Sequence, residues 1–384
     1  MRGIDTMKDV MILSPGPTQV HEDVRREMSL PVVLPEGHPD FVDYYLALTG
    51  KLKSIFKTKN DIRILNGEGI LGLEAAMASL LESGDQVLCI ENGLFGRTFG
   101  EMAENYGAEV TYFSSDSKKP IDLIGLEKLL EKNQNYKLAT FVHCETPTGV
   151  INNIEKINAL LNKHGILSVV DAVSTIGGEK IETDQWKLDV VITASQKCLS
   201  APSGLVIISI SDDAWEMMSN KKRKTLSFYT NLLIWKDIEH TKKLPYSQPI
   251  AHFYALNKAV ERWNQEDVLA RHKLIGNGVK QAVINAGLNL YGESGFSNTV
   301  SAVMIPENIT YKMIREELWK EYNLFVPSAP GELEEKVLRI GHMGENCNEE
   351  QLYRLLKGIT MVFKKYGVYL KEDLHKAFAN ALSK

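Results

Sequence analysis

Short apolar runs alternate with longer helical patterns between about residues 60 and 210 of the chain. This alternation predicts a parallel sheet covered by helices on both faces. The predicted strands are residues 86–90, 109–113, 138–143, 167–171, 190–194 and 205–209. Between two of them, Ile154, Ile157, Leu160 and Leu161 repeat at the spacing of one helix face, and Gly165 follows at a position typical of a helix C-terminus. A β-α-β unit is therefore expected here.

Beyond about residue 265 the pattern changes to helix, strand and helix, with apolar segments at residues 299–305 and 337–340 and a long amphipathic end. We therefore expect an N-terminal arm over residues 1–19, a large α/β domain over 20–265 and a smaller C-terminal α/β domain over 266–384. No repeat or flexible linker separates them, so a tight interface is expected.

Composition favours an ordinary globular protein. The 384 residues are 44% hydrophobic and 24% charged, and the formal net charge of -5 gives no reason to expect a nucleic-acid partner. No apolar run has the length of a signal peptide or a membrane span, so we expect a cytoplasmic protein without a membrane partner. The four cysteines lack metal-ligand spacing, which makes a metal site or a disulfide framework unexpected.

Chemistry is expected at the carboxyl ends of the parallel strands, where ligands bind in such sheets. The residues just after the predicted strands include Phe95, Thr146, Asp171, Ser174, Gln196 and Lys197. Lys197 directly follows an apolar strand, where burial would lower its pKa and make it a nucleophile that forms Schiff bases. A surface lysine in a loop is the alternative.

Asp171 places a carboxylate at the end of an otherwise apolar strand, and a buried charge needs a partner. A protonated pyridine nitrogen is such a partner, because the carboxylate keeps the ring protonated and the ring then withdraws electrons. An aspartate that caps the following turn is the alternative.

The segments 169–178 and 194–204, which carry Asp171 and Lys197, resemble the class V aminotransferases, the group of alanine–glyoxylate and serine–pyruvate aminotransferases. The resemblance extends from Ser14 to His342, with the motifs in the family's order. It implies a fold-type-I PLP-transferase: a large cofactor-binding domain with a mostly parallel seven-stranded sheet, a smaller C-terminal α/β domain, and a homodimer with a shared active site.

The resemblance also implies roles for single residues. Lys197 would form the Schiff base with a vitamin B6 compound, and Asp171 would partner the pyridine nitrogen. Val173 would lie beneath the ring, Phe95 would stack above it, and Thr146 would bond its phenolic oxygen. A plain core residue is the alternative for Phe95.

The resemblance also implies which residues contact the substrate and the cofactor phosphate. Arg339 resembles the arginine that clamps the substrate carboxylate, with Gly16 nearby, although a surface-paired arginine is the alternative. The turn at residues 66–72 opens a helix, so Glu68, Gly69 and Ile70 lie where backbone N–H groups would hold a cofactor phosphate. Gln196 would contribute to the same site.

Two positions depart from most of the family. Glu68 stands where relatives carry a small hydroxyl residue, and its carboxylate would repel a phosphate. Leu244 replaces a tyrosine that reaches the phosphate from the neighbouring subunit, although Ser247 could replace the adjoining threonine. These departures resemble the pyridoxamine–pyruvate transaminases, a branch in which free pyridoxal and pyridoxamine are substrates. Against this reading, Pro330 stands where that branch has a second arginine.

The expected function is an aminotransferase that converts pyridoxamine and pyruvate to pyridoxal and L-alanine. A conventional enzyme with bound pyridoxal 5'-phosphate, acting on alanine or serine with glyoxylate or pyruvate, is the alternative if Glu68 turns to solvent. A cysteine desulfurase is disfavoured because Cys347 follows Arg339 instead of preceding it, and a non-catalytic binding module would be expected to lose Lys197 or Asp171. The expected partners are a small keto acid and an amine.

Overall fold

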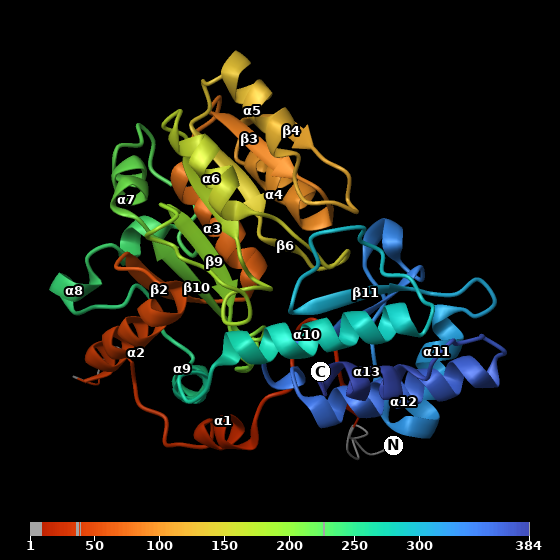
Figure 1. Ribbon diagram of the computed structural model, residues 1–384. Coiled ribbons are helices and arrows are strands. Elements are labelled where there is room, and N and C mark those ends of the chain that lie inside the picture. Colours follow the sequence, from red (N-terminus) through yellow and green to blue (C-terminus); the bar gives the residue numbers. More distant parts are fainter. Residues whose placement is uncertain (1–9, 36–37, 39, 226, 384) are drawn as a thin grey trace, which may run out of the picture.

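The computed structural model describes residues 10–35, 38, 40–225 and 227–383 of the chain. They form a large α/β part and a smaller part built by the C-terminal elements, which are blue in Figure 1. Helix α10 (Val268–Asn285) leads from the first part into the second.

The large part contains a sheet of seven strands. In spatial order they are β2 (Asp61–Asn66), β10 (Leu205–Ile210), β9 (Val190–Ala194), β8 (Leu167–Asp171), β5 (Leu138–Val142), β3 (Gln86–Glu91) and β4 (Glu109–Ser114). Strand β10 is antiparallel to both neighbours, and all other pairs are parallel. The prediction of a mostly parallel seven-stranded sheet is confirmed, and the ends of the six predicted strands are correct to within one residue.

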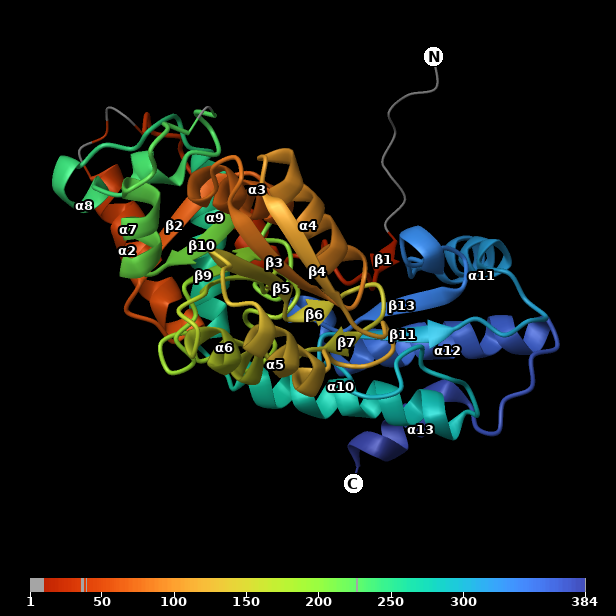
Figure 2. The same cartoon turned by 90° about the horizontal axis from the view of Figure 1, so that it is seen from above.

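Helices cover both faces of the sheet, so every residue of β5, β8, β9 and β10 is buried. Figure 2 shows α3 (Gly69–Leu80) and α4 (Leu94–Asn105) on one face, with α5 (Leu123–Lys132) and α6 (Ile154–Asn162) on the other. Helix α6 contains the predicted apolar face from Ile154 to Leu161, and Gly165, with a φ of 68°, lies in the turn after it. The remaining elements of this part are α1 (Glu22–Glu27), α2 (Phe41–Phe56), β6 (Cys144–Glu145), β7 (Val150–Ile151), α7 (Asp212–Ser219), a 3-10 turn (Leu232–Trp235), α8 (Ile238–Thr241) and α9 (Ile250–Trp263).

The smaller part holds two short two-stranded sheets against a layer of helices. Strand β11 (Val300–Met304) pairs antiparallel with β13 (Val337–Gly341), and β1 (Met11–Ile12) pairs parallel with β12 (Leu324–Phe325). The helices are α10, α11 (Tyr311–Glu317), which continues as a π-helical turn (Leu318–Tyr322), α12 (Glu349–Lys365) and α13 (Leu374–Leu382). Short 3-10 turns lie at Gly331–Leu333 and Gly344–Asn346.

The buried apolar residues form two main clusters. The larger runs from Val24 to Val260, and the second joins Leu13 to residues between Ile275 and Phe378. The domain limits at residues 19 and 265 stay predictions, although the gap between the clusters lies near the second limit. Residues 1–9 of the predicted N-terminal arm lie outside the described residues.

Candidate active site

Two predicted residues meet at the carboxyl edge of the sheet. Asp171 ends β8, and its backbone pairs with Ile192 of β9 and Val142 of β5. Lys197 lies just beyond the end of β9, in the turn that leads toward β10. The charge of Asp171 acts to raise the pKa of Lys197, so the two groups are within electrostatic range of each other.

The side chain of Lys197 is half-buried and turned toward the N-terminal segment. Its Nζ donates a hydrogen bond to the carbonyl oxygen of Pro15 at 2.8 Å. The pKa of Lys197 is lowered, first because burial disfavours the ammonium form and second because Arg339 is positively charged. A lowered pKa increases the share of neutral amine, which is the form that attacks a carbonyl carbon.

Asp171 is buried and lacks an ionic partner among the described residues. Its Oδ1 accepts a hydrogen bond from the backbone N–H of Val173 at 2.9 Å. Burial raises the pKa of Asp171 to about 6, while the Val173 bond and the charge of Lys197 act in the opposite direction. A cationic pyridine nitrogen would stabilise the ionised carboxylate, so this buried, incompletely paired group fits the ring of a vitamin B6 compound.

Val173 lies beside the first residue of α3. A β-carbon on Gly69 would stand 2.8 Å from Cγ2 of Val173, so only a glycine allows this approach. The predicted ring contact of Val173 and the predicted phosphate contact of Gly69 are therefore neighbours in space.

The turn before α3 is capped by its own carboxylate. Glu68 is the N-cap residue, and its Oε1 accepts a hydrogen bond from the backbone N–H of Ile70 at 3.2 Å. Both side chains are exposed. One N–H group of the predicted phosphate cradle is thus already paired with a negative charge from the chain itself.

Phe95 and Thr146 are connected through Glu145, which sequence reasoning did not identify as a site residue. Glu145 is fully buried and accepts hydrogen bonds from the backbone N–H groups of Phe95 at 3.1 Å and of Gly96 at 2.6 Å. Phe95 is half-buried in the first turn of α4, and Thr146 is buried next to Glu145. No signal in the surrounding sequence indicated Glu145 in advance, because its histidine and threonine neighbours make this segment polar.

Gln196 and Ser247, the other predicted cofactor contacts, lie in different surroundings. Gln196 is buried, and its backbone oxygen accepts a hydrogen bond from the N–H of Thr18. Ser247 is exposed, and its carbonyl oxygen accepts a bond from Nδ2 of Asn66, directly before the Gly67 turn. The structure therefore brings the backbone of Ser247 close to the candidate phosphate turn of its own chain.

Arg339 lies on β13 and is half-buried. Its Nε donates to the carbonyl oxygen of Ser328 at 2.8 Å, whereas its terminal nitrogens have no hydrogen-bond partner and no carboxylate in the part of the chain that the structure describes. Burial lowers the pKa of Arg339 to about 10, so it stays charged at neutral pH. The hollow beside it is lined by Val10, Ile12, Ser14, Gly16, Pro17, Thr18, Gln19, Val20, Arg25, Phe325, Pro327 and Arg339. The two predicted substrate residues, Gly16 and Arg339, thus share one hollow.

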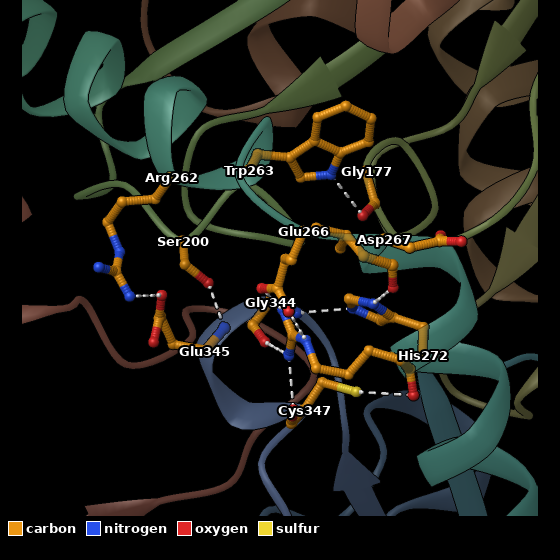
Figure 3. Close-up of polar contacts among 12 residues, drawn as sticks. Gly177, Ser200, Arg262, Trp263, Glu266, Asp267, His272, Gly344, Glu345 and Cys347 are labelled. Carbon is orange, nitrogen blue, oxygen red and sulfur yellow. Dashed lines mark hydrogen bonds and ion pairs between the residues drawn. The ribbon is translucent and has the colours of Figure 1, made fainter.

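The turn that carries Lys197 is held from behind by a cluster shown in Figure 3. Oγ of Ser200 accepts a hydrogen bond from the N–H of Glu345 at 2.8 Å, and Nε2 of His272 accepts one from the N–H of Gly344 at 2.9 Å. Burial lowers the pKa of His272 to about 3, so the ring is neutral and can accept this bond. A β-carbon on Gly344 would stand 2.9 Å from the backbone oxygen of Cys198, so the Arg339 strand continues into direct contact with the Lys197 turn.

The described residues contain neither a metal-binding cluster nor a helix that could span a membrane. No group of three or more histidine, cysteine, aspartate or glutamate residues there could hold a metal ion. Within the same residues, no helix combines the length and the apolar character needed to cross a membrane.

Comparison with known proteins identifies the family of the chain. Residues 51–284 match the family model described as aminotransferase class-V. An uncharacterized aminotransferase of Methanocaldococcus jannaschii is 32% identical over 377 residues, covering 96% of both chains. The pyridoxamine–pyruvate transaminase of Mesorhizobium japonicum is 31% identical over 350 residues, covering 90% of this chain and 89% of its own. The crystal structure of ureidoglycine–glyoxylate aminotransferase from Bacillus subtilis superimposes with a TM-score of 0.94, 29% identity and 99% coverage of both chains.

The family model spans more than half of the chain, and the two relatives cover nearly all of it. The superposition on the structural neighbour covers 99% of both chains and confirms the predicted fold type I. The class V aminotransferase fold implies dependence on pyridoxal phosphate. The chain therefore belongs to the class V aminotransferases.

Proposed function

We propose that this aminotransferase uses free pyridoxamine and pyruvate as substrates and forms pyridoxal and L-alanine. The observation that carries the proposal is the position of Glu68, whose carboxylate caps the N-terminus of α3 through the N–H of Ile70. A phosphate bound there would have to displace this carboxylate and would experience repulsion from it. A ligand without phosphate meets neither obstacle.

The residues around this turn support the same conclusion. Leu244, an apolar residue, stands where the resemblance leads us to expect a tyrosine that contacts phosphate, and it packs against the main core instead. Ser247 of the same chain approaches the turn through its backbone carbonyl, which accepts a hydrogen bond from Nδ2 of Asn66. A relative of the chain, the pyridoxamine–pyruvate transaminase of Mesorhizobium japonicum, carries this activity in its name.

In the proposed reaction the residues of the site bind the B6 ring, exclude water from it and move a proton. The B6 ring, when bound, supplies the electron sink for the carbon that loses a proton. Asp171 would hold the proton on the ring nitrogen, and the side chains of Val173 and Phe95 would exclude water from the two ring faces. The neutral amine of Lys197 would act as the general base that moves a proton between the two reacting carbons, and the same amine could afterwards condense with the pyridoxal aldehyde with loss of water.

Recognition of the keto acid is assigned to Arg339. Its terminal nitrogens lack partners among the described residues and can donate two parallel hydrogen bonds to a carboxylate. Gly16 leaves room beside Lys197 for the reacting part of the substrate. Pro330, which caps a 3-10 turn, provides no cation at the position where the related branch has a second arginine.

A conventional enzyme with bound pyridoxal 5'-phosphate is the second candidate. It is favoured by the exposure of Glu68, because an exposed carboxylate can rotate into solvent and free the N–H of Ile70. The substrates would then be alanine or serine with glyoxylate or pyruvate. The structural neighbour from Bacillus subtilis is named as a glyoxylate-dependent enzyme.

We further propose a cytoplasmic homodimer that shares its active sites. Phe228 and Tyr229 are 60% and 54% exposed, and Tyr229 stacks on Tyr246 with ring centroids 4.4 Å apart, next to Ser247. A second copy would cover these apolar rings. Sedimentation should give twice the chain mass, and the replacement Phe228→Asp should shift the measured mass toward that of the monomer.

The cytoplasmic location is supported by the cysteines. The four buried free cysteines suit a reducing compartment.

The deciding experiment is to purify the protein without added B6, release any ligand with acid and identify it by mass. Pyridoxamine and pyruvate are then supplied, and pyridoxal is measured. Absence of a phosphate ester together with formation of pyridoxal supports the proposal. Stoichiometric pyridoxal phosphate without turnover of pyridoxamine would reject it in favour of the second candidate.

A further inference from the structure

Glu145 lies at the junction of two segments that the candidate site needs. It belongs to β6, immediately before Thr146, and its side chain is fully buried. Its Oε1 accepts a hydrogen bond from the N–H of Gly96 at 2.6 Å, and its Oε2 accepts one from the N–H of Phe95 at 3.1 Å. Both N–H groups belong to the first turn of α4, where backbone donors have no partner within the helix.

We propose that Glu145 is a positioning residue for the B6 ring, because it fixes Phe95 above the ring relative to Thr146 beside it. The inference rests on the proposed function only in so far as a B6 ring binds between these residues, with or without phosphate. Glu145 itself is not assigned any contact with the ring.

The backbone of Glu145 completes this connection. Its carbonyl oxygen accepts hydrogen bonds from the N–H groups of Thr148 at 3.2 Å and of Gly149 at 2.8 Å, which closes the turn that carries Thr146. One residue therefore holds the Thr146 turn through its main chain and the start of α4 through its side chain. A displacement of Glu145 would change the separation of Phe95 and Thr146.

Two glycines make room for the carboxylate. A β-carbon on Gly93 would stand 2.7 Å from Cδ of Glu145, and one on Gly96 would stand 3.2 Å from its Oε1. The φ of Gly93 is 174°, an extended value that any residue adopts, so the requirement for glycine here is one of space. The first turn of α4 is thus built around the side chain of Glu145.

No cation forms an ion pair with Glu145 among the described residues, so the helix N-terminus is its electrostatic partner. The charged groups that face it are both acidic: Glu91 at the end of β3 and Asp171 at the end of β8. Burial raises the pKa of Glu145 to about 7, these two carboxylates add to the rise, and the two N–H bonds oppose it. Its charge therefore changes near neutral pH.

The replacement Glu145→Gln isolates this role. Glutamine has almost the same shape but only one acceptor atom, so its amide N–H₂ would face the N–H of Phe95 or of Gly96. The matched control is Glu91→Gln. Glu91 accepts a bond from the N–H of Gly93 at 3.2 Å, at the same end of α4, but it does not contact Phe95. The other oxygen of Glu91 accepts a hydrogen bond from the hydroxyl of Ser114, which can also accept one from an amide, so glutamine can keep both contacts.

The test measures the affinity for pyridoxal and, separately, for pyridoxal phosphate by absorbance of the Lys197-bound compound between pH 5.5 and 8.5. Glu145→Gln should weaken binding of the preferred compound at least tenfold and flatten its pH dependence. Glu91→Gln should change the affinity less than twofold and keep a pH dependence, shifted to lower pH because the charge of Glu91 helps to raise the pKa of Glu145. In a Phe95→Ala background, Glu145→Gln should add less than a further twofold, since the effect passes through Phe95.

Independent, multiplicative effects of Glu145→Gln and Phe95→Ala would overturn the proposal, as would unchanged binding in Glu145→Gln. If that variant does not fold, Glu145→Asp can be combined with Phe95→Ala in the same way. Its shorter side chain moves the carboxylate oxygens away from the N–H groups of α4. The test does not use pyruvate and includes the phosphate ester. The role of Glu145 could therefore still be judged from this test if the pyridoxamine–pyruvate activity were rejected.

Discussion

Gly16 lies against the side chain of Lys197. A β-carbon at position 16 would stand 2.3 Å from Cδ and 2.5 Å from Nζ of that lysine, and the φ of Gly16 is 102°. The backbone conformation therefore favours glycine, and an added β-carbon would force the end of the Lys197 side chain to move. The N-terminal segment thereby forms one wall of the space in which the lysine amine must move.

We expect the replacement Gly16→Ala to lower covalent attachment of B6 to Lys197 by at least about tenfold, because a displacement of about 1 Å at a reacting group costs up to about a hundredfold. Attachment is measured by borohydride trapping and mass spectrometry. The control is Gly84→Ala, at a φ of 89° with no atom near the added β-carbon. Equal losses in both variants would assign the effect to backbone strain and not to Lys197.

Removal of the charge of Glu68 should favour phosphate. In Glu68→Gln the amide oxygen can still cap the N–H of Ile70, while the repulsion toward an anion disappears. We expect the affinity for pyridoxal phosphate relative to pyridoxal to rise at least about tenfold, less than a buried charge would give because Glu68 is exposed. Glu74→Gln, on the same helix, is the control and should leave the ratio unchanged. An unchanged ratio in Glu68→Gln would contradict the phosphate-exclusion argument.

The sheet was largely predictable because β5, β8, β9 and β10 are buried on both faces and therefore appear as continuous apolar runs. Strand β2 was not among the predicted strands. It contains Arg63, a charged residue that is only 1% exposed because Asp61 and Glu239 pair with its guanidinium. Glu239 is distant in sequence, so the pattern around Arg63 alone could not indicate a buried strand.

In the site, too, residues with a local sequence pattern were predictable, whereas contacts between distant segments were not. Lys197 and Asp171 were predictable because each places a charge at the end of an apolar strand. The contacts of Glu145 and of the Pro15 carbonyl depend on backbone groups from remote segments, which carry no residue-type signature. Contacts of this kind become visible only in the folded chain.

Arg339→Lys should separate substrate binding from B6 binding. Lysine cannot keep the bond from Nε to the carbonyl of Ser328, and it lacks the planar pair of donors that suits a carboxylate. We expect the KM for the keto acid to rise about tenfold to a hundredfold, since a hydrogen bond to a charged group contributes about 1.5–3 kcal/mol. The affinity for the B6 compound, measured without keto acid, should change little. A parallel loss of both affinities would show that Arg339 has a structural role instead.

Asp171→Asn tests the partner of the ring nitrogen through stability. Because burial raises the pKa of Asp171 from 3.8 to about 6, the folded protein holds this proton to higher pH than the unfolded chain does. The resulting stabilisation is complete below about pH 4 and is lost as the pH rises through about 6. Asparagine does not titrate and retains an oxygen that accepts the N–H of Val173.

The free energy of unfolding of the unsubstituted protein, minus that of the Asp171→Asn variant, should therefore fall by up to about 3 kcal/mol between pH 4 and pH 7. Urea unfolding of both proteins, freed of B6, measures this difference, and carboxylates common to both cancel. A flat difference would mean that Asp171 keeps its ordinary pKa. Saturation with pyridoxal should reduce the slope, because a cationic ring nitrogen beside Asp171 stabilises the ionised carboxylate and lowers its pKa again. If the slope persists with ligand bound, Asp171 is not the residue that pairs with the ring.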